Sequence, residues 1–345
     1  MTTTPLIAEI GYFEPWWMQL LKSLLIFFVV FNLVPIALVA DRKVLGRFQH
    51  RYGPNRVGPF GAMQPIADIG KLIFKEQFRP RTANGWLFAL APVISVMTAA
   101  ATVAIIPFSD VVDIFGTPVG LYGIDPSIGI LYAFAFGGIA FYGLMLGGWA
   151  SGGKYAFLGS MRSAAQLISY EVSQGLALIG VVMMAGSLSL TQIVEAQTGS
   201  GHVWYFIPQF VGFVIFLVSG FAETNRPPFD LPEADAELVQ GYVTEYGGGR
   251  FAAFYAAEYV NIIVVSALTA TLFLGGWNVP FVDPPTWVDP IVVLVKTLVL
   301  VFFFIWVRAT LPRLRYDQLM SLGWKVFLPL ATLNALVTAI LVVVT

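Results

Sequence analysis

The chain lacks cysteine altogether and has only two histidines among its 345 residues. Without cysteine, this polypeptide cannot form disulfides, thiolate nucleophiles, cysteine-ligated iron–sulfur clusters or cysteine-ligated zinc sites. His50 and His202 both lie outside the apolar runs, so a haem held by two histidines inside a helix bundle is excluded as well. The chain therefore carries no common protein-ligated redox centre of its own.

Charged residues are also scarce. They make up 11% of the sequence, whereas a soluble domain has about 25%. The net charge of −1 provides no field that would attract polyanions. With 57% hydrophobic residues and a mean hydropathy of +0.78, the composition excludes a water-soluble globule, a disordered protein and a nucleic-acid binder with a basic face.

Long apolar runs dominate the sequence. A hydrocarbon core of about 30 Å requires roughly 20 apolar residues in a helix, and these runs are continuously apolar, unlike the alternating strands of a membrane barrel. We therefore predict an all-α integral membrane protein that forms one polytopic domain over residues 1–345. The eight predicted spans cover about 17–40, 86–108, 128–149, 163–187, 203–222, 252–276, 288–310 and 325–344.

The distribution of positive charge predicts the orientation. Seventeen of the 19 lysines and arginines fall in the loops 41–85, 150–162, 223–251 and 311–324 or at the adjoining helix ends. Because loops rich in lysine and arginine stay cytoplasmic, both termini are expected on the opposite side of the membrane. Two lysines lie inside spans. We expect Lys22 to reach the interface, and Lys296 to mark a separate polar site nearer the outer face or to act as a counterpart of Glu171.

The first cytoplasmic loop combines a turn-rich stretch with a short helix. Residues 51–59 contain glycines and prolines that prevent a regular helix, and a helix is predicted from about 62 to 76. Its two faces differ, because Ile66, Ile69 and Ile73 lie opposite Asp68, Lys71 and Lys75. This pattern is typical of an amphipathic helix in the membrane interface; the alternative interpretation is the lip of a lipid-accessible cavity.

A carboxylate interrupts the fourth apolar span. Glu171 is about eight residues into the fourth span, which places it about 12 Å from the cytoplasmic end. An ionised carboxylate at this depth costs at least about 2.5 kcal/mol, so it should pair, take up a proton or face water. We favour a proton-carrying role for Glu171 over a neutral glutamate that is hydrogen-bonded between helices.

The cytoplasmic segment after the fifth span concentrates acidic side chains. Six of them fall within the 23 residues from 223 to 245, together with Arg226, and Glu258 follows in the next span. Like charges this close cannot all ionise in a partly dry site, so some should hold protons near neutral pH. We favour a chain of proton-exchanging carboxylates leading from a cytoplasmic-side cavity toward Glu171. The alternatives are a solvated acidic loop and a Mg²⁺ or Ca²⁺ site, which the irregular spacing disfavours.

The proton-path candidates are Glu171, Glu223, Asp230, Glu233, Asp235, Glu237, Glu245 and Glu258. We predict no metal site, and no catalytic residue in this chain alone.

Four blocks of sequence, in this order, carry a resemblance to a known family. They are residues 41–49 with 53–59 and 64–68; residues 154–156 with 169–172; residues 222–226 with 228–230 and 237–238; and residues 312–318. Together they resemble the quinone-site membrane subunit of respiratory NADH:quinone oxidoreductase (complex I), the family known as subunit 1 or the H subunit. The sequence departs from the family pattern at Asp41 and Asp235, where glutamate is usual, and each departure keeps the charge on a shorter side chain.

The resemblance implies a quinone chamber where the membrane arm meets the hydrophilic redox arm. Quinone, with ubiquinone favoured, would enter from lipid as the substrate and be reduced near an iron–sulfur cluster of a neighbouring subunit. The family's acidic path maps onto the candidates above apart from Asp235. Arg226 is the matching cation, and Arg42 and Asp68 match polar residues along the quinone tunnel.

The resemblance also implies the partners and the location of the chain. NADH, FMN and iron–sulfur clusters would reside only on partner subunits. The partners would include hydrophilic quinone-site subunits, small membrane subunits, antiporter-like subunits and membrane lipid, but no nucleic acid. The expected location is a bacterial cell inner membrane with both termini periplasmic. The alternatives are the related membrane subunit of a membrane-bound hydrogenase, a stand-alone ion-coupled transporter and a passive scaffold for peripheral subunits.

Overall fold

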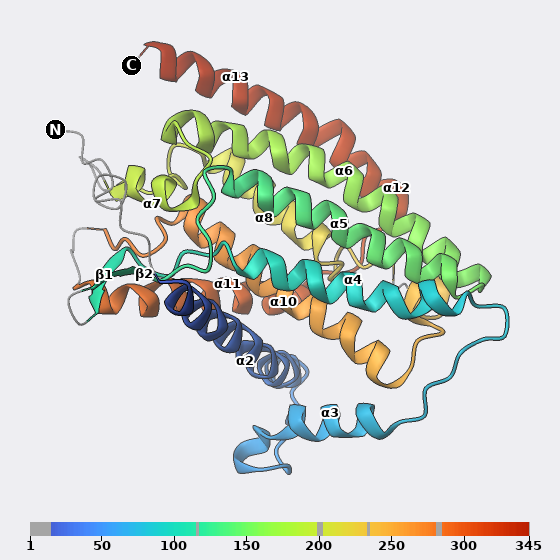
Figure 1. Ribbon diagram of the computed structural model, residues 1–345. Coiled ribbons are helices and arrows are strands. Elements are labelled where there is room, and N and C mark those ends of the chain that lie inside the picture. Colours follow the sequence, from blue (N-terminus) through green and yellow to red (C-terminus); the bar gives the residue numbers. More distant parts are fainter. Residues whose placement is uncertain (1–14, 115–116, 199–202, 233–234, 281–284, 345) are drawn as a thin grey trace.

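Long apolar helices form one bundle in the computed structural model, which describes residues 15–344 except 115–116, 199–202, 233–234 and 281–284 (Figure 1). Seven helical segments in this part of the chain are long and apolar enough to cross a membrane. The prediction of an all-α membrane protein is confirmed. The segments are α2 (Trp16–Phe48), α4 (Gly85–Val103), α5 (Gly129–Ala150), α6 (Lys154–Ala185), α10 (Gly248–Phe273), α11 (Asp289–Thr310) and the continuous stretch α12, η4 and α13.

The fifth predicted span corresponds to a shorter helix. Helix α8 (Phe210–Glu223) has 14 residues, equivalent to about 21 Å of rise. The residues before it form turns, in which the Ile207 and Gln209 amides donate to the carbonyls of Trp204 and Tyr205. Pro208 lacks an N–H and favours such a break. The eight predicted runs therefore correspond to seven full-length helical segments and one short apolar helix.

Shorter elements connect the long helices. On one side are η1 (Pro59–Gly61), α3 (Gln64–Phe74), α9 (Asp235–Leu238) and η2 (Gly241–Val243); elsewhere are α7 (Leu190–Thr198) and η3 (Thr286–Val288). The last helical stretch comprises α12 (Tyr316–Ser321), a π-helical turn η4 (Leu322–Phe327) and α13 (Leu328–Val344).

Strands β1 (Val111–Ile114) and β2 (Thr117–Gly120) form an antiparallel hairpin in which Val111 lies opposite Gly120. This hairpin fixes Lys22 of α2. The Lys22 ammonium donates to the Gly120 carbonyl at 3.2 Å and lies 4.7 Å from the centre of the Tyr122 ring, and the residue is buried. The hairpin thus supplies an acceptor and an aromatic face close to the helix, and the expectation that Lys22 extends to the interface stays a prediction.

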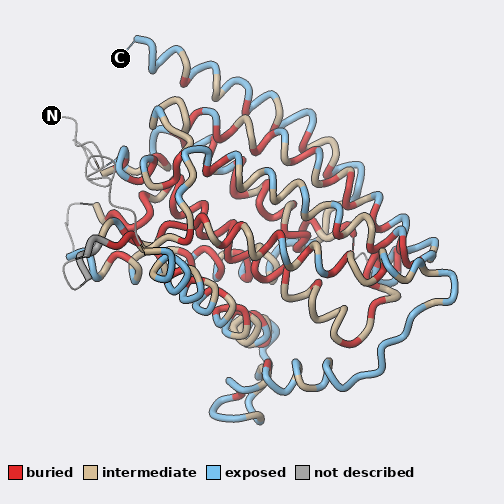
Figure 2. The backbone as a smooth tube through the Cα atoms, in the orientation of Figure 1, coloured by how far each residue is buried: buried red, intermediate tan, exposed pale blue. Residues whose placement is uncertain are grey.

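Helix α10 forms the centre of the bundle. From Ile262 to Phe273 each of its residues is buried, and the helix packs against α2, α4, α8 and α11. Two of its buried hydroxyl groups are satisfied within the helix, since Thr269 and Thr271 donate to the carbonyls of Val265 and Ala267. The exposed apolar surface lies instead on outer helices such as α2 and α13 (Figure 2).

The four positively charged loops lie at one end of the bundle. The Asn84 amide donates to the Ala150 carbonyl at 3.1 Å, which joins the first of these loops to the second. Arg162 pairs with Glu237 at 2.5 Å, and the Arg313 guanidinium donates to the Asp230 carbonyl. Helix α3 lies at this end too, beside α2 and α10 (Figure 1).

Candidate functional site

The site begins where α8 ends and the acidic loop starts. The Thr224 hydroxyl donates to the Gly220 carbonyl at 3.0 Å, so the loop begins directly against the last turn of the helix. From the neighbouring helix α6, the buried Gln166 amide donates to the carbonyls of Ala222 and Phe229, both at 2.7 Å. Because one side chain binds both ends of this turn, the backbone that carries Arg226 is held against α6.

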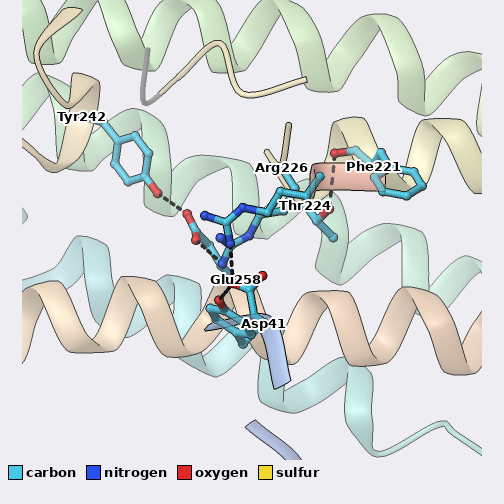
Figure 3. A network of polar contacts seen from close by, with 8 residues as sticks. Asp41, Phe221, Thr224, Arg226, Tyr242 and Glu258 are labelled. Carbon is cyan, nitrogen blue, oxygen red and sulfur yellow. Dashed lines mark hydrogen bonds and ion pairs between the residues drawn. The ribbon is translucent and has the colours of Figure 1, made fainter. Parts of the chain in front are cut away.

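Arg226 forms a buried ion pair with Glu258 of α10. The guanidinium Nη2 and the carboxylate Oε2 are 3.2 Å apart, and Tyr242 donates its hydroxyl to the other carboxylate oxygen at 3.1 Å (Figure 3). Arg226 and Glu258 are 6% and 7% exposed. The guanidinium also lies over the rings of Tyr259 and Tyr255, 4.4 and 5.4 Å from their centres. Desolvated groups of this kind interact strongly, because little water screens them.

A second ion pair, in which the carboxylate is buried and the arginine partly exposed, lies beside Arg226. Tyr259 donates to the Asp41 carboxylate at 2.7 Å, and Arg308 pairs with the same carboxylate oxygen. Asp41, Arg226, Tyr259 and Arg308 line a small cavity between α2, α10 and α11 whose other walls are apolar. Asp41 and Arg308 were not predicted as site residues. Each lies near the end of an apolar span, where a charged residue ordinarily indicates only that the membrane-spanning segment ends there.

A larger cavity lies on the other side of Glu258. It is lined by residues of α4, α5, α6, α8 and α10. Three predicted proton-path residues face it, namely Glu171 of α6, Glu223 of α8 and Glu258 of α10. Gln174 donates to Glu223 at 3.1 Å. The structure thus brings together carboxylates that are up to 87 positions apart in sequence.

The lining of this larger cavity changes along the bundle. The carboxylates, Asn225 and Asn261 lie toward the end with the charged loops, whereas Leu178, Leu190 and Leu272 lie toward the opposite end. Serine and threonine side chains of α4 contribute to the wall between them. The cavity is therefore polar at one end and apolar at the other, so a carboxylate placed in it meets fewer solvating groups toward the apolar end.

Three further predicted acids, Glu237, Glu245 and Asp230, do not line the larger cavity. Glu237 is exposed and pairs with Arg162. Glu245 is partly buried near Gly153, and Asp230 is partly buried with its carbonyl bound to Arg313. Glu233 lies outside the described residues, and Asp235 begins α9 without a described side-chain position.

Arg42 and Asp68 form a separate ion pair. Their side chains are 2.5 Å apart and join α2 to α3, and Gln64 also donates to Asp68 at 3.1 Å. The pair is partly exposed. Arg42 follows Asp41 on α2, so adjacent residues serve two different polar contacts, one buried in the bundle and one toward α3. The three isoleucines of α3 are exposed, as its amphipathic pattern predicts.

Lys296 lies far from these carboxylates along the bundle. Its ammonium donates to the carbonyls of Leu274, Gly276 and Asn278 at 2.6–2.7 Å, just past the end of α10. It also lies 4.5 Å from the centre of a Trp204 ring. These contacts indicate that Lys296 caps a helix end and forms a separate polar site, and that it is not the counterpart of Glu171.

Comparison with known proteins gives a consistent assignment. A model of the NADH dehydrogenase family matches residues 21–339. The H 1 subunit of the NADH-quinone oxidoreductase of Geobacter metallireducens is 52% identical over 335 residues, which cover 97% of this chain and 98% of the relative. The H 2 subunit of the Geobacter sulfurreducens enzyme is 54% identical over 92% of this chain and 94% of the relative. NADH-quinone oxidoreductase subunit 8 of Thermus thermophilus is 48% identical over 95% of this chain and 88% of the relative.

These matches confirm the resemblance inferred from the four sequence blocks. They cover all four blocks as well as the helices that form both cavities. The chain belongs to the NADH dehydrogenase family, with the H subunits of bacterial NADH-quinone oxidoreductases among its relatives.

Proposed function

We propose that this chain is the membrane subunit of a proton-pumping NADH:quinone oxidoreductase that forms part of the quinone chamber and couples quinone reduction to proton movement. One observation carries the proposal: Arg226 lines the small cavity and pairs with Glu258, which lines the larger carboxylate cavity. A change of charge in the small cavity therefore reaches the carboxylates through a single buried side chain.

The quinone side of the proposal rests on polar groups set among apolar walls. Arg42, Asp68 and Arg226 are the chamber candidates, and the small cavity adds Asp41 and Arg308. Ubiquinone is the favoured substrate, entering from lipid near the exposed apolar face of α3. Because the chain has no cysteine, its electrons would come from an iron–sulfur cluster of a hydrophilic partner subunit, with NADH and FMN also bound by partners.

The proton side of the proposal follows from the stoichiometry of the reaction. Reduction of a quinone to a quinol takes up two electrons and two protons, so each turnover places charge and a proton demand in the chamber. In a poorly screened site this demand alters the charge balance of Arg226 and Glu258. Protonation would then change at the acids of the loop, at Glu223 and at Glu171, with Asp230, Glu233, Asp235, Glu237 and Glu245 as further members of the path. Small and antiporter-like membrane subunits would receive the effect.

The whole chain would act as one polytopic domain of a bacterial inner membrane, with both termini periplasmic. The charged loops, which share one end of the bundle, would face the cytoplasm and dock the hydrophilic arm. A membrane-bound hydrogenase subunit would use the same acids without reducing quinone, and co-purification with an NADH-oxidising arm distinguishes the two. A stand-alone ion-coupled transporter would instead transport ions in liposomes without any partner.

The carboxylate path is tested with charge-neutral substitutions in the assembled complex. We expect Glu171→Gln and Glu223→Gln each to lower NADH:quinone activity and proton pumping at least fivefold, because an amide cannot exchange the proton that the path requires. Glu195→Gln on α7 is the matched control, since Glu195 is an exposed glutamate on a helix at the end of the bundle opposite the charged loops. Normal pumping by both glutamine variants would refute the coupling role. The passive scaffold for peripheral subunits would then be the remaining interpretation.

A further inference from the structure

Helix α5 contains six glycines, and three of them permit close packing. A β-carbon at Gly143 would lie 2.3 Å from the Ser95 hydroxyl, and one at Gly148 would lie 2.5 Å from the Ala156 carbonyl. At Gly147 it would lie 3.1 Å from the Phe254 ring. At Gly143 and Gly148 a neighbouring helix therefore leaves no room for a side chain, and at Gly147 the packed Phe254 ring would have to shift by a few tenths of an ångström.

Gly137 and Gly138 differ from the other glycines of the helix. A β-carbon at Gly137 would have one neighbouring atom within 4 Å, the Oε1 of Glu223, at 3.3 Å. At Gly138 its single neighbour would be the Oε1 of Glu171, at 3.6 Å. Among the described residues, no backbone outside the helix and no packed apolar side chain approaches either position. Close packing against a neighbouring helix therefore does not account for the two adjacent glycines. Helix propensity does not account for them either, because glycine weakens a helix interior relative to alanine.

A polar group in the same cavity lacks a partner. Ser219 is fully buried on α8, one helical turn from Glu223, and lines the cavity. Its hydroxyl has no hydrogen-bond partner in the part of the chain that the structure describes. Buried polar groups are nearly always satisfied by protein or by ordered water. The polar part of the cavity wall includes Glu223, Thr224 and Asn225, and the cavity is large enough to hold water.

We infer that Gly137 and Gly138 are positioning residues, which keep a hydrated space between α5 and the carboxylates of Glu223 and Glu171. The inference rests on the proposed proton path and identifies what keeps that path open. Water beside the two carboxylates solvates their ionised forms and connects them for proton exchange. A methyl group at either glycine replaces polar space with hydrocarbon while leaving both acids in place.

The two glycines make a graded experiment. Gly137→Ala places a methyl group against Glu223, whose carboxylate must move by a few tenths of an ångström, whereas Gly138→Ala fits beside Glu171 in ordinary contact. Gly175→Ala on α6 is the matched control, because its β-carbon would meet only the Phe134 ring, at 3.9 Å. Each of the three changes replaces a glycine in a helix interior by alanine, so the gain in helix propensity should be the same for all three variants.

The measurements are made on the assembled complex in proteoliposomes. We expect Gly137→Ala to lower quinone-dependent turnover about threefold to tenfold, Gly138→Ala to lower it about twofold to threefold, and Gly175→Ala to leave it unchanged. The number of protons moved per electron pair is measured alongside turnover, together with NADH oxidation by an artificial acceptor, which reports on the amount of intact hydrophilic arm.

The pH profile separates this role from a general loss of stability. The titratable groups facing the cavity are Tyr170 and Glu171 on α6, Glu223 on α8 and Glu258 on α10, with Arg226 paired to Glu258. Poorer solvation of an ionised carboxylate should shift the turnover profile of both alanine variants to higher pH. A purely structural defect would lower activity at every pH by the same factor and leave the profile unmoved.

The inference is overturned if Gly137→Ala and Gly138→Ala match Gly175→Ala in turnover, proton ratio and pH profile. If the Gly137→Ala variant fails to assemble, Gly138→Ala decides the outcome, since its methyl group fits without displacement. Failure of the proposed function itself looks different, because Glu171→Gln and Glu223→Gln would then also pump normally.

Discussion

Arg226 and Glu258 have almost no access to water, so the two charges depend on each other. Glu258 also accepts a hydrogen bond from Tyr242, and the Arg226 guanidinium makes cation–π contacts with two tyrosine rings. Breaking a buried ion pair by removing one partner typically costs about 3–5 kcal/mol, because the other charge is left uncompensated. Neutralising both partners avoids this cost, so single and double substitutions should behave differently.

We therefore expect Arg226→Gln to destabilise the subunit by about 3–5 kcal/mol and to reduce the amount of assembled complex. Combining it with Glu258→Gln should restore most of the assembly, while quinone-dependent turnover stays low. Native gels and the thermal midpoint of the purified complex report the first effect, and NADH:quinone activity reports the second. A double variant as poorly assembled as the single one would show that the pair is not the source of stability.

Residue-level prediction relied on acids that stand out against their apolar surroundings. Glu171 is conspicuous because it interrupts a span, and Glu223 and Glu258 flank the acidic loop; all three face one cavity, although their roles in proton transfer stay a prediction. Asp41 and Arg308 were missed as site residues because they pair between helices 267 positions apart. A charge near a span end has the same sequence signature whether it faces water or a buried partner.

At the scale of elements, the acidic loop depends on a close approach to α6. A β-carbon at Gly159 would lie 2.8 Å from the Cα of Gly241, 2.9 Å from the Pro232 carbonyl oxygen and 2.9 Å from the Tyr242 nitrogen. All three are backbone atoms, which cannot move away as a flexible side chain can. Glycine at this one position therefore allows η2 to lie directly on α6 and places Tyr242 next to Glu258.

We expect Gly159→Ala to destabilise the docking of η2 by about 1–3 kcal/mol, the usual cost of overpacking. The Tyr242–Glu258 hydrogen bond should weaken, so NADH:quinone activity should be lost at a lower temperature than in the wild type. Thermal inactivation of the assembled complex measures this effect, and Gly175→Ala again serves as the control. Equal inactivation temperatures for the two variants would contradict the packing argument.

The sequence predicts helices well when their apolar runs are long and unbroken. It overestimates the fifth run, because 203–209 is as apolar as a helix but forms turns before Phe210. It gives no sign of the β1–β2 hairpin, whose stability comes from contacts with distant parts of the chain, such as that of Gly120 with Lys22. Hydropathy reports burial in lipid and does not report backbone pairing or turn geometry.

At the scale of the whole molecule, the two ends of the bundle differ in charge. The four loops at one end carry or adjoin 17 of the 19 lysines and arginines and contact one another. The opposite end includes α7, the hairpin and η3, where Asp125 accepts hydrogen bonds from Ser189 and Thr191, and Asp289 accepts one from Ser109. Positively charged loops are generally retained on the cytoplasmic side, so we expect this asymmetry to set one orientation during insertion.

The natural absence of cysteine makes this orientation directly measurable. Ala196→Cys on α7 and Trp287→Cys on η3 introduce single thiols at exposed positions of one end, and Asp317→Cys introduces one at the other. An impermeant maleimide should label the first two variants in right-side-out membrane vesicles, and the third only in inverted vesicles or after the hydrophilic arm is removed. The unsubstituted chain, which has no thiol, sets the background. The opposite labelling pattern would place the charged loops in the periplasm, away from any NADH-oxidising arm, and the proposed quinone chamber could not then lie at that end.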